Sequence, residues 1–142
     1  MKKPNGSLNR YILDTSAFLT LIEDEDGADV VQNLLQRAKQ DNLKIFASFV
    51  SFTEVLYITL QERDDEEAQI RLDLMKKLPI ERVESSEDIG RLAGELKAQH
   101  RISFADAWIA ATAQFYNATL VHKDPEFEQI QTGITLLPLP YK

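Results

Sequence analysis

The sequence contains no cysteine among its 142 residues. This absence excludes disulfides, thiolate metal sites and cysteine nucleophiles, and it fits a cytoplasmic protein. Long apolar runs are also missing, and the longest falls far short of the roughly 18 to 20 residues that a membrane span needs. The start of the chain has two lysines but no apolar segment before the turn-forming residues Pro4–Ser7. We therefore expect neither a signal peptide nor a membrane segment.

Positive charge is in the minority, with 16 basic against 23 acidic side chains and a formal net charge of −7. A protein that coats nucleic acid through a broad basic surface has the opposite balance. A nuclease is not excluded, because bound divalent cations neutralise carboxylates in its site and leave local basic patches to hold the nucleic acid. The candidate patches, each equally suited to an ordinary helix surface, are Arg71, Lys76 and Lys77, and separately Arg91, Lys97 and Arg101.

Glycine and histidine are scarce as well. The five glycines form neither a dinucleotide fingerprint nor a phosphate-binding loop. Gly90 and Gly94 fall inside an expected helix, where they indicate close packing. The two histidines, His100 and His122, are too few for a zinc site. We expect His122 at the surface, at the end of a strand.

Short apolar strands alternate with helical segments along the chain. Strands are expected at 11–13, 43–47, 79–83, 118–121 and 134–137. Helices are expected at 17–22, 28–40, 51–63, 64–78, 85–100 and 103–115. The buried face of the fourth helix is expected to contain Ile70, Leu74 and Leu78. This alternation predicts one α/β domain over residues 1–142, in which a mostly parallel five-stranded sheet lies between two layers of helices.

Four carboxylates fall at one edge of this expected sheet. Asp14 ends the first strand, and Asp124 follows the fourth. Glu54 and Asp106 lie in the first turns of the helix after the second strand and of the helix before the fourth. Open parallel sheets bind ligands at this edge, where the strand order reverses. Acids that converge there repel one another unless cations bind, and oxygen ligands favour Mg²⁺ or Mn²⁺. Two such ions could activate water and stabilise the leaving oxygen in phosphodiester cleavage.

Each acid also has a purely structural explanation. Asp106 with Ser103, and Glu54 with Ser51, fit capping boxes at helix starts. The other two acids precede helix-start residues and fit ordinary N-caps. Capping does not explain why all four acids fall at one edge of the same sheet.

The motifs together resemble those of PIN-domain proteins, of the kind found as VapC-type toxins in bacterial and archaeal toxin–antitoxin pairs. The segments that carry the resemblance are LDTSAFL, SFVSFTEVL, SFADAWIAATA and ATLVHKDPEF, in a region from about Tyr11 to Leu137. The resemblance implies a parallel sheet flanked by helices and a Mg²⁺- or Mn²⁺-dependent endoribonuclease that hydrolyses RNA phosphodiester bonds. It also implies an antitoxin that inserts a basic side chain among the acids, and a homodimer.

The resemblance assigns the catalytic and metal-ligating positions to Asp14, Glu54, Asp106 and Asp124. The small polar positions beside the first and third acids, where a hydroxyl can orient a water or a carboxylate, are Thr15, Ser16 and Ser103. The chain departs from the family pattern at His122, where Thr, Ser or Asn is common. That departure puts in question the water or phosphate contact expected there. Glu126 stands where some relatives carry a further acid.

Two other functions stay open at this point. A catalytically degenerate PIN-like binding module is consistent with His122 and with the acidic net charge. An aspartate-dependent phosphatase or phosphotransfer domain would use Asp14 as its nucleophile. Haloacid-dehalogenase-like enzymes, however, need a second Asp two residues further on, where Ser16 stands.

Overall fold

A single parallel sheet runs through the computed structural model, which describes residues 9–130 and 133–142. Its strands are β1 (Asn9–Leu13), β2 (Leu43–Ser48), β3 (Glu81–Val83), β4 (Thr119–His122) and β5 (Leu136–Pro138). They lie in the order β3-β2-β1-β4-β5, and every neighbouring pair is parallel. The predicted five-stranded α/β fold is therefore confirmed. The turn predicted at residues 4–7 lies outside the described residues.

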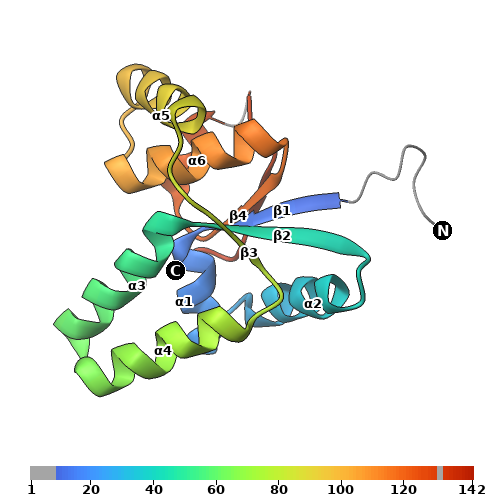
Figure 1. Cartoon of the computed structure of the whole chain (residues 1–142), viewed down its shortest axis with the longest axis vertical. Helices are drawn as coiled ribbons and strands as arrows, with labels where there is room; N and C mark the ends of the chain where they lie inside the picture. Colours follow the sequence, from blue (N-terminus) through green and yellow to red (C-terminus); the bar gives the residue numbers. More distant parts are fainter. Residues whose placement is uncertain (1–8, 131–132) are drawn as a thin grey trace.

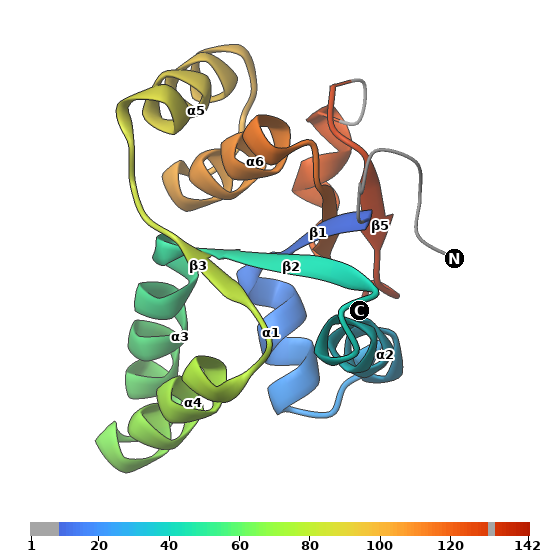
Figure 2. The ribbon, with the colours of Figure 1, turned by 45° about the vertical axis from the view of Figure 1, so that its right-hand side comes forward.

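Helices cover both faces of the sheet (Figure 1). One layer is formed by α1 (Thr15–Ile22), α2 (Ala28–Lys39), α3 (Phe49–Glu62) and α4 (Asp65–Lys77). The opposite layer is formed by α5 (Glu87–Gln99) and α6 (Phe104–Tyr116), as the rotated view in Figure 2 also shows. A short 3₁₀ helix, η2 (Pro125–Ile130), follows β4. None of the helices in the described residues is long and apolar enough to span a membrane.

Neighbouring residues of a strand point into different cores. Ile12 of β1 and Leu120 of β4 contribute to the core beneath α5 and α6. Leu13 and Val121, the next residues of the same strands, contribute to the core on the side of α1 to α4. This alternation follows from the two-residue period of a strand. Because both faces of the sheet are covered, its central strands read as continuous apolar runs in the sequence.

The alanine-rich segment of α6 allows that helix to lie close to β1 and β2. Its alanines at positions 107, 110, 111 and 113 are all buried. The helix ends at Asn117, whose φ of 52° lies in the left-handed region that Asn adopts more readily than most residues. Close packing along the helix fixes the position of its first turn, which carries Asp106.

The start of α3 differs from the prediction by two residues. Ser48 is the N-cap, and its Oγ accepts a hydrogen bond from the Val50 amide at 3.3 Å. The helix therefore begins at Phe49, and Ser51 lies within it. Since Glu54 falls in the second turn, the capping box predicted for Ser51 and Glu54 is wrong.

The buried face of α4 also differs from the prediction. Ile70 and Leu74 are 56% and 39% exposed. The helix instead buries Ala68, Arg71 and Met75. Arg71 can occupy this position because its guanidinium finds charged partners while its stem packs as apolar surface.

Arg71 does not belong to a basic surface patch that could hold RNA, although its place beside Lys76 and Lys77 in the sequence suggests one. Its Nε donates to Glu67 Oε2 at 2.9 Å, and its Nη2 lies 3.9 Å from Glu23 Oε1. The side chain is 6% exposed and sits between α4, α1 and Thr59 of α3. Arg71 therefore links α4 to α3 and to Glu23, the residue that follows α1, and its charge is already paired.

The two glycines of α5 have different surroundings. A Cβ added at Gly90 would lie 3.2 Å from Cη2 of Trp108 on α6, as expected for close packing. A Cβ at Gly94 would meet nothing within 4 Å, so the packing explanation is wrong for this glycine.

Alanine substitutions at these glycines form a matched test of the α5–α6 packing. Gly94→Ala should raise the free energy of unfolding by about 0.5 to 1 kcal/mol, because alanine is the better helix former and the site is open. Gly90→Ala should gain less, because Trp108 has to shift. Urea unfolding monitored by circular dichroism measures both changes. A gain for Gly90→Ala equal to or above that for Gly94→Ala would contradict this packing.

Candidate active site

The strand order reverses at β1, whose neighbours are β2 on one side and β4 on the other. Asp14 follows β1 directly, and Asp124 follows β4 after one intervening residue. The Asp14 amide donates to the Val121 carbonyl at 2.9 Å, so the ends of the two strands stay side by side. The sheet topology thus brings the first and last predicted acids to the same edge.

Asp14 is a buried carboxylate with one oxygen held and one oxygen open. Its Oδ2 accepts hydrogen bonds from the Ser16 amide, at 3.0 Å, and from the Ser16 hydroxyl. Its Oδ1 is buried and has no hydrogen-bond partner among the described residues. Burial raises the pKa of Asp14 to about 6, and the charges of Glu54 and Asp124 act in the same direction, against the hydrogen bonds from Ser16. An unpartnered buried carboxylate oxygen is a fitting position for a cation.

Ser16 joins the first acid to the loop after β4. Its hydroxyl accepts a hydrogen bond from the Lys123 amide at 2.9 Å while it donates to Asp14. This places Ser16 where the sequence predicted a residue that orients the first acid. The bond also ties the start of α1 to the residue preceding Asp124.

Glu54 is held by groups from two helices. The Thr15 hydroxyl donates to Glu54 Oε1 at 2.6 Å, and the Ser51 hydroxyl lies 3.0 Å from the same Thr15 oxygen. The Tyr57 hydroxyl donates to Glu54 Oε2 at 3.3 Å. Sequence reasoning missed Tyr57, although its spacing of three residues from Glu54 places both side chains on one face of α3.

Asp106 combines a structural and an electrostatic role. Its amide donates to Ser103 Oγ at 3.1 Å, so the Ser103 half of the predicted capping box is confirmed. The residue is only 9% exposed, and burial raises the pKa of its carboxyl group to about 8, with further contributions from Asp14, Asp124, Glu54 and Glu126. The first turn of α6 therefore places its acid near the other acids of the site.

Three carboxylates form the tightest group. One oxygen each from Asp106, Asp124 and Glu126 lies within 4.8 Å of the others. The Glu126 amide donates to Asp124 Oδ1 at 2.9 Å, which sets the distance between these two acids. Asp14 and Glu54 lie outside this group, but both are near enough to raise the pKa of Asp106. Glu126, which the sequence analysis named only as a further acid of some relatives, thus lies close to Asp106 and Asp124.

His122 is buried, so its expected position at the surface is wrong. Its Nδ1 accepts a hydrogen bond from the Asp124 amide at 3.1 Å, and its ring packs against Phe127 and Tyr141. Burial lowers the pKa of the imidazole. The side chain therefore supports the backbone of the last acid and is enclosed by aromatic rings, which removes it from direct contact with a solvent-exposed ligand.

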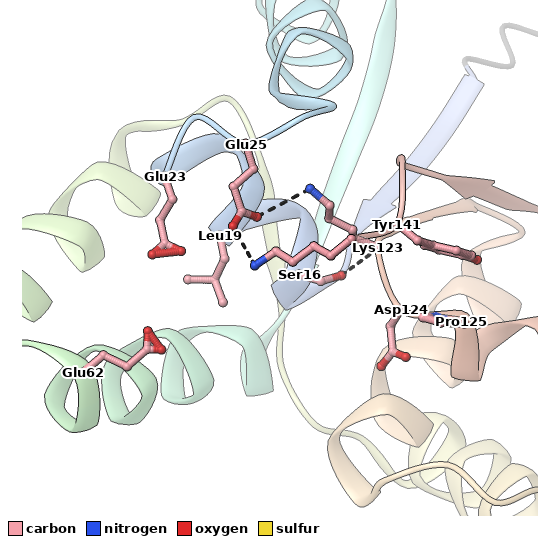
Figure 3. A pocket seen from close by; sticks show the side chains of 10 residues that line it. Ser16, Leu19, Glu23, Glu25, Glu62, Lys123, Asp124, Pro125 and Tyr141 are labelled. Atoms are coloured by element: carbon pink, nitrogen blue, oxygen red, sulfur yellow. Dashed lines mark hydrogen bonds and ion pairs between the residues drawn. The ribbon is translucent and has the colours of Figure 1, made fainter.

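A pocket of about 600 Å³ opens beside Ser16 and Asp124 (Figure 3). Lys123 and Lys142 line it, and their Nζ atoms lie 3.6 and 2.8 Å from the Glu25 carboxylate. Figure 3 shows Glu23 and Glu62 on the side of the pocket away from Asp124. The carboxylate site thus adjoins a cavity that presents charges of both signs.

The acids of the site offer only carboxylate oxygens as metal ligands. Carboxylates of this kind bind hard divalent cations, which also relieve the repulsion among the acids. The open Oδ1 of Asp14 and the close group of Asp106, Asp124 and Glu126 both fit such an ion. An open parallel sheet with carboxylates at its switch point defines a class of α/β domain that binds its ligand at that edge.

Sequence comparison identifies the family within this class. The family model of the PIN domain matches residues 11–132. The chain therefore belongs to the PIN domain family. This membership does not support the aspartate-phosphatase alternative. No curated protein matches the chain by sequence.

Solved structures of toxin–antitoxin proteins share this fold. VapBC2 from Rickettsia felis, bound to a DNA fragment from its promoter, is 26% identical with a TM-score of 0.76, covering 92% of this chain and 99% of that one. VapBC-1 from nontypeable Haemophilus influenzae is 24% identical with a TM-score of 0.70, covering 91% and 97%. VapC20 from Mycobacterium tuberculosis, a toxin that cleaves the sarcin–ricin loop, is 16% identical with a TM-score of 0.68, covering 88% and 96%.

The metal-free protein should lose stability as the pH rises from about 4 to about 8. Asp14 and Asp106 have pKa values of about 6 and about 8 in the fold, against 3.8 for an ordinary aspartate. Over this interval the folded state binds more protons than the unfolded state, so the free energy of unfolding falls as the pH rises. The stabilisation that these two carboxyl groups contribute is fully present below the pKa of the unfolded state. It is lost as the pH rises through the pKa values of the folded state.

Urea unfolding in a chelator, at about pH 5 and about pH 8, measures this dependence. Asp106→Asn should make the free energy of unfolding less dependent on pH, because the substitution removes the carboxyl group whose pKa is raised more. Asp73→Asn is the matched control, since Asp73 is an exposed acid on α4 that accepts a hydrogen bond from Gln69. A pH dependence that is unchanged in Asp106→Asn would show that this carboxyl group is not the source.

Proposed function

We propose that this protein is a Mg²⁺- or Mn²⁺-dependent endoribonuclease and the toxin of a toxin–antitoxin pair. The observation that carries the proposal is the convergence of acids at the switch point of a PIN domain. Asp14 presents an open buried oxygen there, beside the close group of Asp106, Asp124 and Glu126. The relatives with solved structures support the proposal, since one of them is a toxin that cleaves the sarcin–ricin loop.

We assign the metal-ligating and catalytic roles to Asp14, Glu54, Asp106 and Asp124, with Glu126 as an additional candidate. A divalent cation bound among them would supply Lewis-acid stabilisation of the phosphate and a more acidic water. Thr15, Ser16 and Ser103 act as positioning residues in this proposal.

The positioning contacts are specific to each acid. Ser16 donates to Asp14 Oδ2, and the buried Oδ1 is left without a hydrogen-bond partner among the described residues. Thr15 holds one oxygen of Glu54, and Tyr57 holds the other. Ser103 fixes the first turn of α6 and with it the direction of Asp106. The orientation of each carboxylate is therefore set before a ligand arrives, which is what electrostatic catalysis requires.

The proposal extends to the partners and the setting of the protein. The substrate is RNA, and a cognate antitoxin is the protein partner, as in the VapBC structures that share the fold. The cluster of carboxylates suits a basic side chain of that antitoxin. We also propose that residues 1–142 form one domain, that the protein is a homodimer and that it acts in the cytoplasm, where a chain without cysteine needs no oxidising environment.

Asp14→Asn and Asp106→Asn should each abolish metal-dependent RNA cleavage. The expected loss exceeds about 100-fold, because residues that only support metal ligands already cost 10- to 100-fold when mutated. Cleavage is measured on total cellular RNA with Mg²⁺ or Mn²⁺, and the new 5′ ends are mapped because the site does not fix the target sequence. Circular dichroism establishes that each variant is folded.

Asp73→Asn serves again as the control, and it should cleave as the wild type does. Wild-type cleavage that survives in either site variant, or that proceeds fully in a chelator, would overturn the proposal. A wild-type protein that cleaves no RNA under any metal condition would favour the alternative of a catalytically degenerate binding module.

A further inference from the structure

Exposed aromatic side chains are few, and one of them differs from the rest. In the described residues they are Tyr57, Phe104, Phe115 and Tyr141. The last three pack against the rings of Trp108, Tyr116 and His122, respectively. Within the described part of the chain, Tyr57 stacks on no other aromatic ring, although 44% of its surface is exposed. Tyr57 is therefore partly open to solvent and has no aromatic partner among the described residues.

Tyr57 lies at the edge of the carboxylate site. Its hydroxyl donates to Glu54 Oε2 at 3.3 Å, and Glu54 lies one turn earlier on the same face of α3. Burial and the charges of Glu54 and Asp106 raise the pKa of the phenol. The charge of Asp106 reaches Tyr57 from α6, on the other side of the sheet edge. Tyr57 thus contacts one acid of the site, Glu54, and is close enough to Asp106 to feel its charge.

The position of the ring is fixed by the groups around its hydroxyl. Glu54 Oε2 accepts a hydrogen bond from the Tyr57 hydroxyl, and Glu54 Oε1 accepts one from the Thr15 hydroxyl at 2.6 Å. Thr15 is buried at the start of α1, so this chain of contacts ends in the core. A tyrosine held in this way loses little freedom when a ligand packs on its face.

We propose that Tyr57 binds the substrate by stacking on an unpaired base next to the scissile phosphate. This inference rests on the proposed ribonuclease function, and it adds to that site a residue that contacts a base rather than a phosphate. Aromatic side chains beside a phosphate-binding site are the usual platforms for unpaired bases, and stacking tolerates any base. A base in a duplex is already stacked on its neighbours, so it cannot use the ring without leaving the helix.

Three variants separate the ring from its hydroxyl and from the general surface. Tyr57→Leu removes the aromatic face, and Tyr57→Phe keeps it but loses the hydrogen bond to Glu54. Phe115→Leu is the matched control, because Phe115 is 46% exposed and lies at the opposite end of α6 from Asp106. Circular dichroism and urea unfolding check the fold of each variant, and Tyr57→Ala replaces Tyr57→Leu if the latter does not fold.

The probe is a fluorescein-labelled single-stranded RNA of mixed sequence and about 12 nucleotides, which is within the range of single-strand binding sites. Its counterpart has the same length and phosphates but no bases. The dissociation constants are measured by fluorescence anisotropy in Ca²⁺. A duplex of the same length is measured in parallel.

Tyr57→Leu should weaken binding of the single strand by about tenfold, within the range of losses known for a single stacked base. It should leave the dissociation constant of the abasic strand unchanged. Tyr57→Phe and Phe115→Leu should both bind the single strand within about twofold of the wild type, because each keeps an aromatic ring at position 57. The wild type should prefer the single strand to the duplex, and Tyr57→Leu should reduce that preference.

Equal binding of the single strand by the wild type and Tyr57→Leu would overturn the inference, even where the wild type cleaves RNA. The same loss on the abasic strand would also overturn it, because the ring would then act on something other than a base. Tyr57 would in that case be assigned to a contact with the sugar–phosphate backbone. A wild type that binds neither strand and cleaves no RNA would overturn the proposed function together with this inference.

Discussion

Repulsion between carboxylates at one edge of the sheet is the constraint on which the site depends. The strand order places Asp14 and Asp124 at the carboxyl ends of adjacent strands, and α6 adds Asp106. These acids cannot separate, because Asp14 is the N-cap of α1 and the turn carrying Asp106 is capped by Ser103. Burial raises the pKa of Asp14 to about 6 and that of Asp106 to about 8, and the charges of the neighbouring acids act in the same direction. A cation among the acids would remove this penalty, so the fold is prepared for one.

Neutral groups around the acids determine which oxygens remain available. Ser16 and Thr15 follow Asp14 in the sequence, yet they hold different carboxylates, Asp14 and Glu54. His122 is fully buried, and its ring accepts a hydrogen bond from the Asp124 amide. The residue that departs from the family pattern therefore supports the backbone of the last acid. The two cores on either side of the sheet make this framework rigid, which electrostatic preorganisation requires.

The parts of the structure that depend on local pattern could be predicted from the sequence. Strand and helix periodicity gave the order of elements, and the rule for parallel sheets placed Asp14 and Asp124 at one edge. The remaining features depend on contacts between distant segments. Burial of His122 requires Tyr141 and Phe127 to close over it, and the inward turn of Arg71 on α4 requires Glu23 from α1. Such contacts leave no periodic signal in the sequence, and neither does the pairing of Tyr57 with Glu54 until the helix register is known.

The central claim is that these acids form one site for a divalent cation, and calorimetric titration of Mn²⁺ tests it without any assumption about the RNA. The wild type is compared with the double variant Asp14→Asn/Asp106→Asn and with Asp73→Asn, at about pH 8, where the raised pKa values leave the carboxyl groups free to ionise. Saturable binding to the wild type and to Asp73→Asn, with none to the double variant, is the predicted result. Equal binding to all three, or no binding to any, would contradict the account and leave Asp14 as the N-cap of α1 and Asp106 as an acid in the first turn of α6.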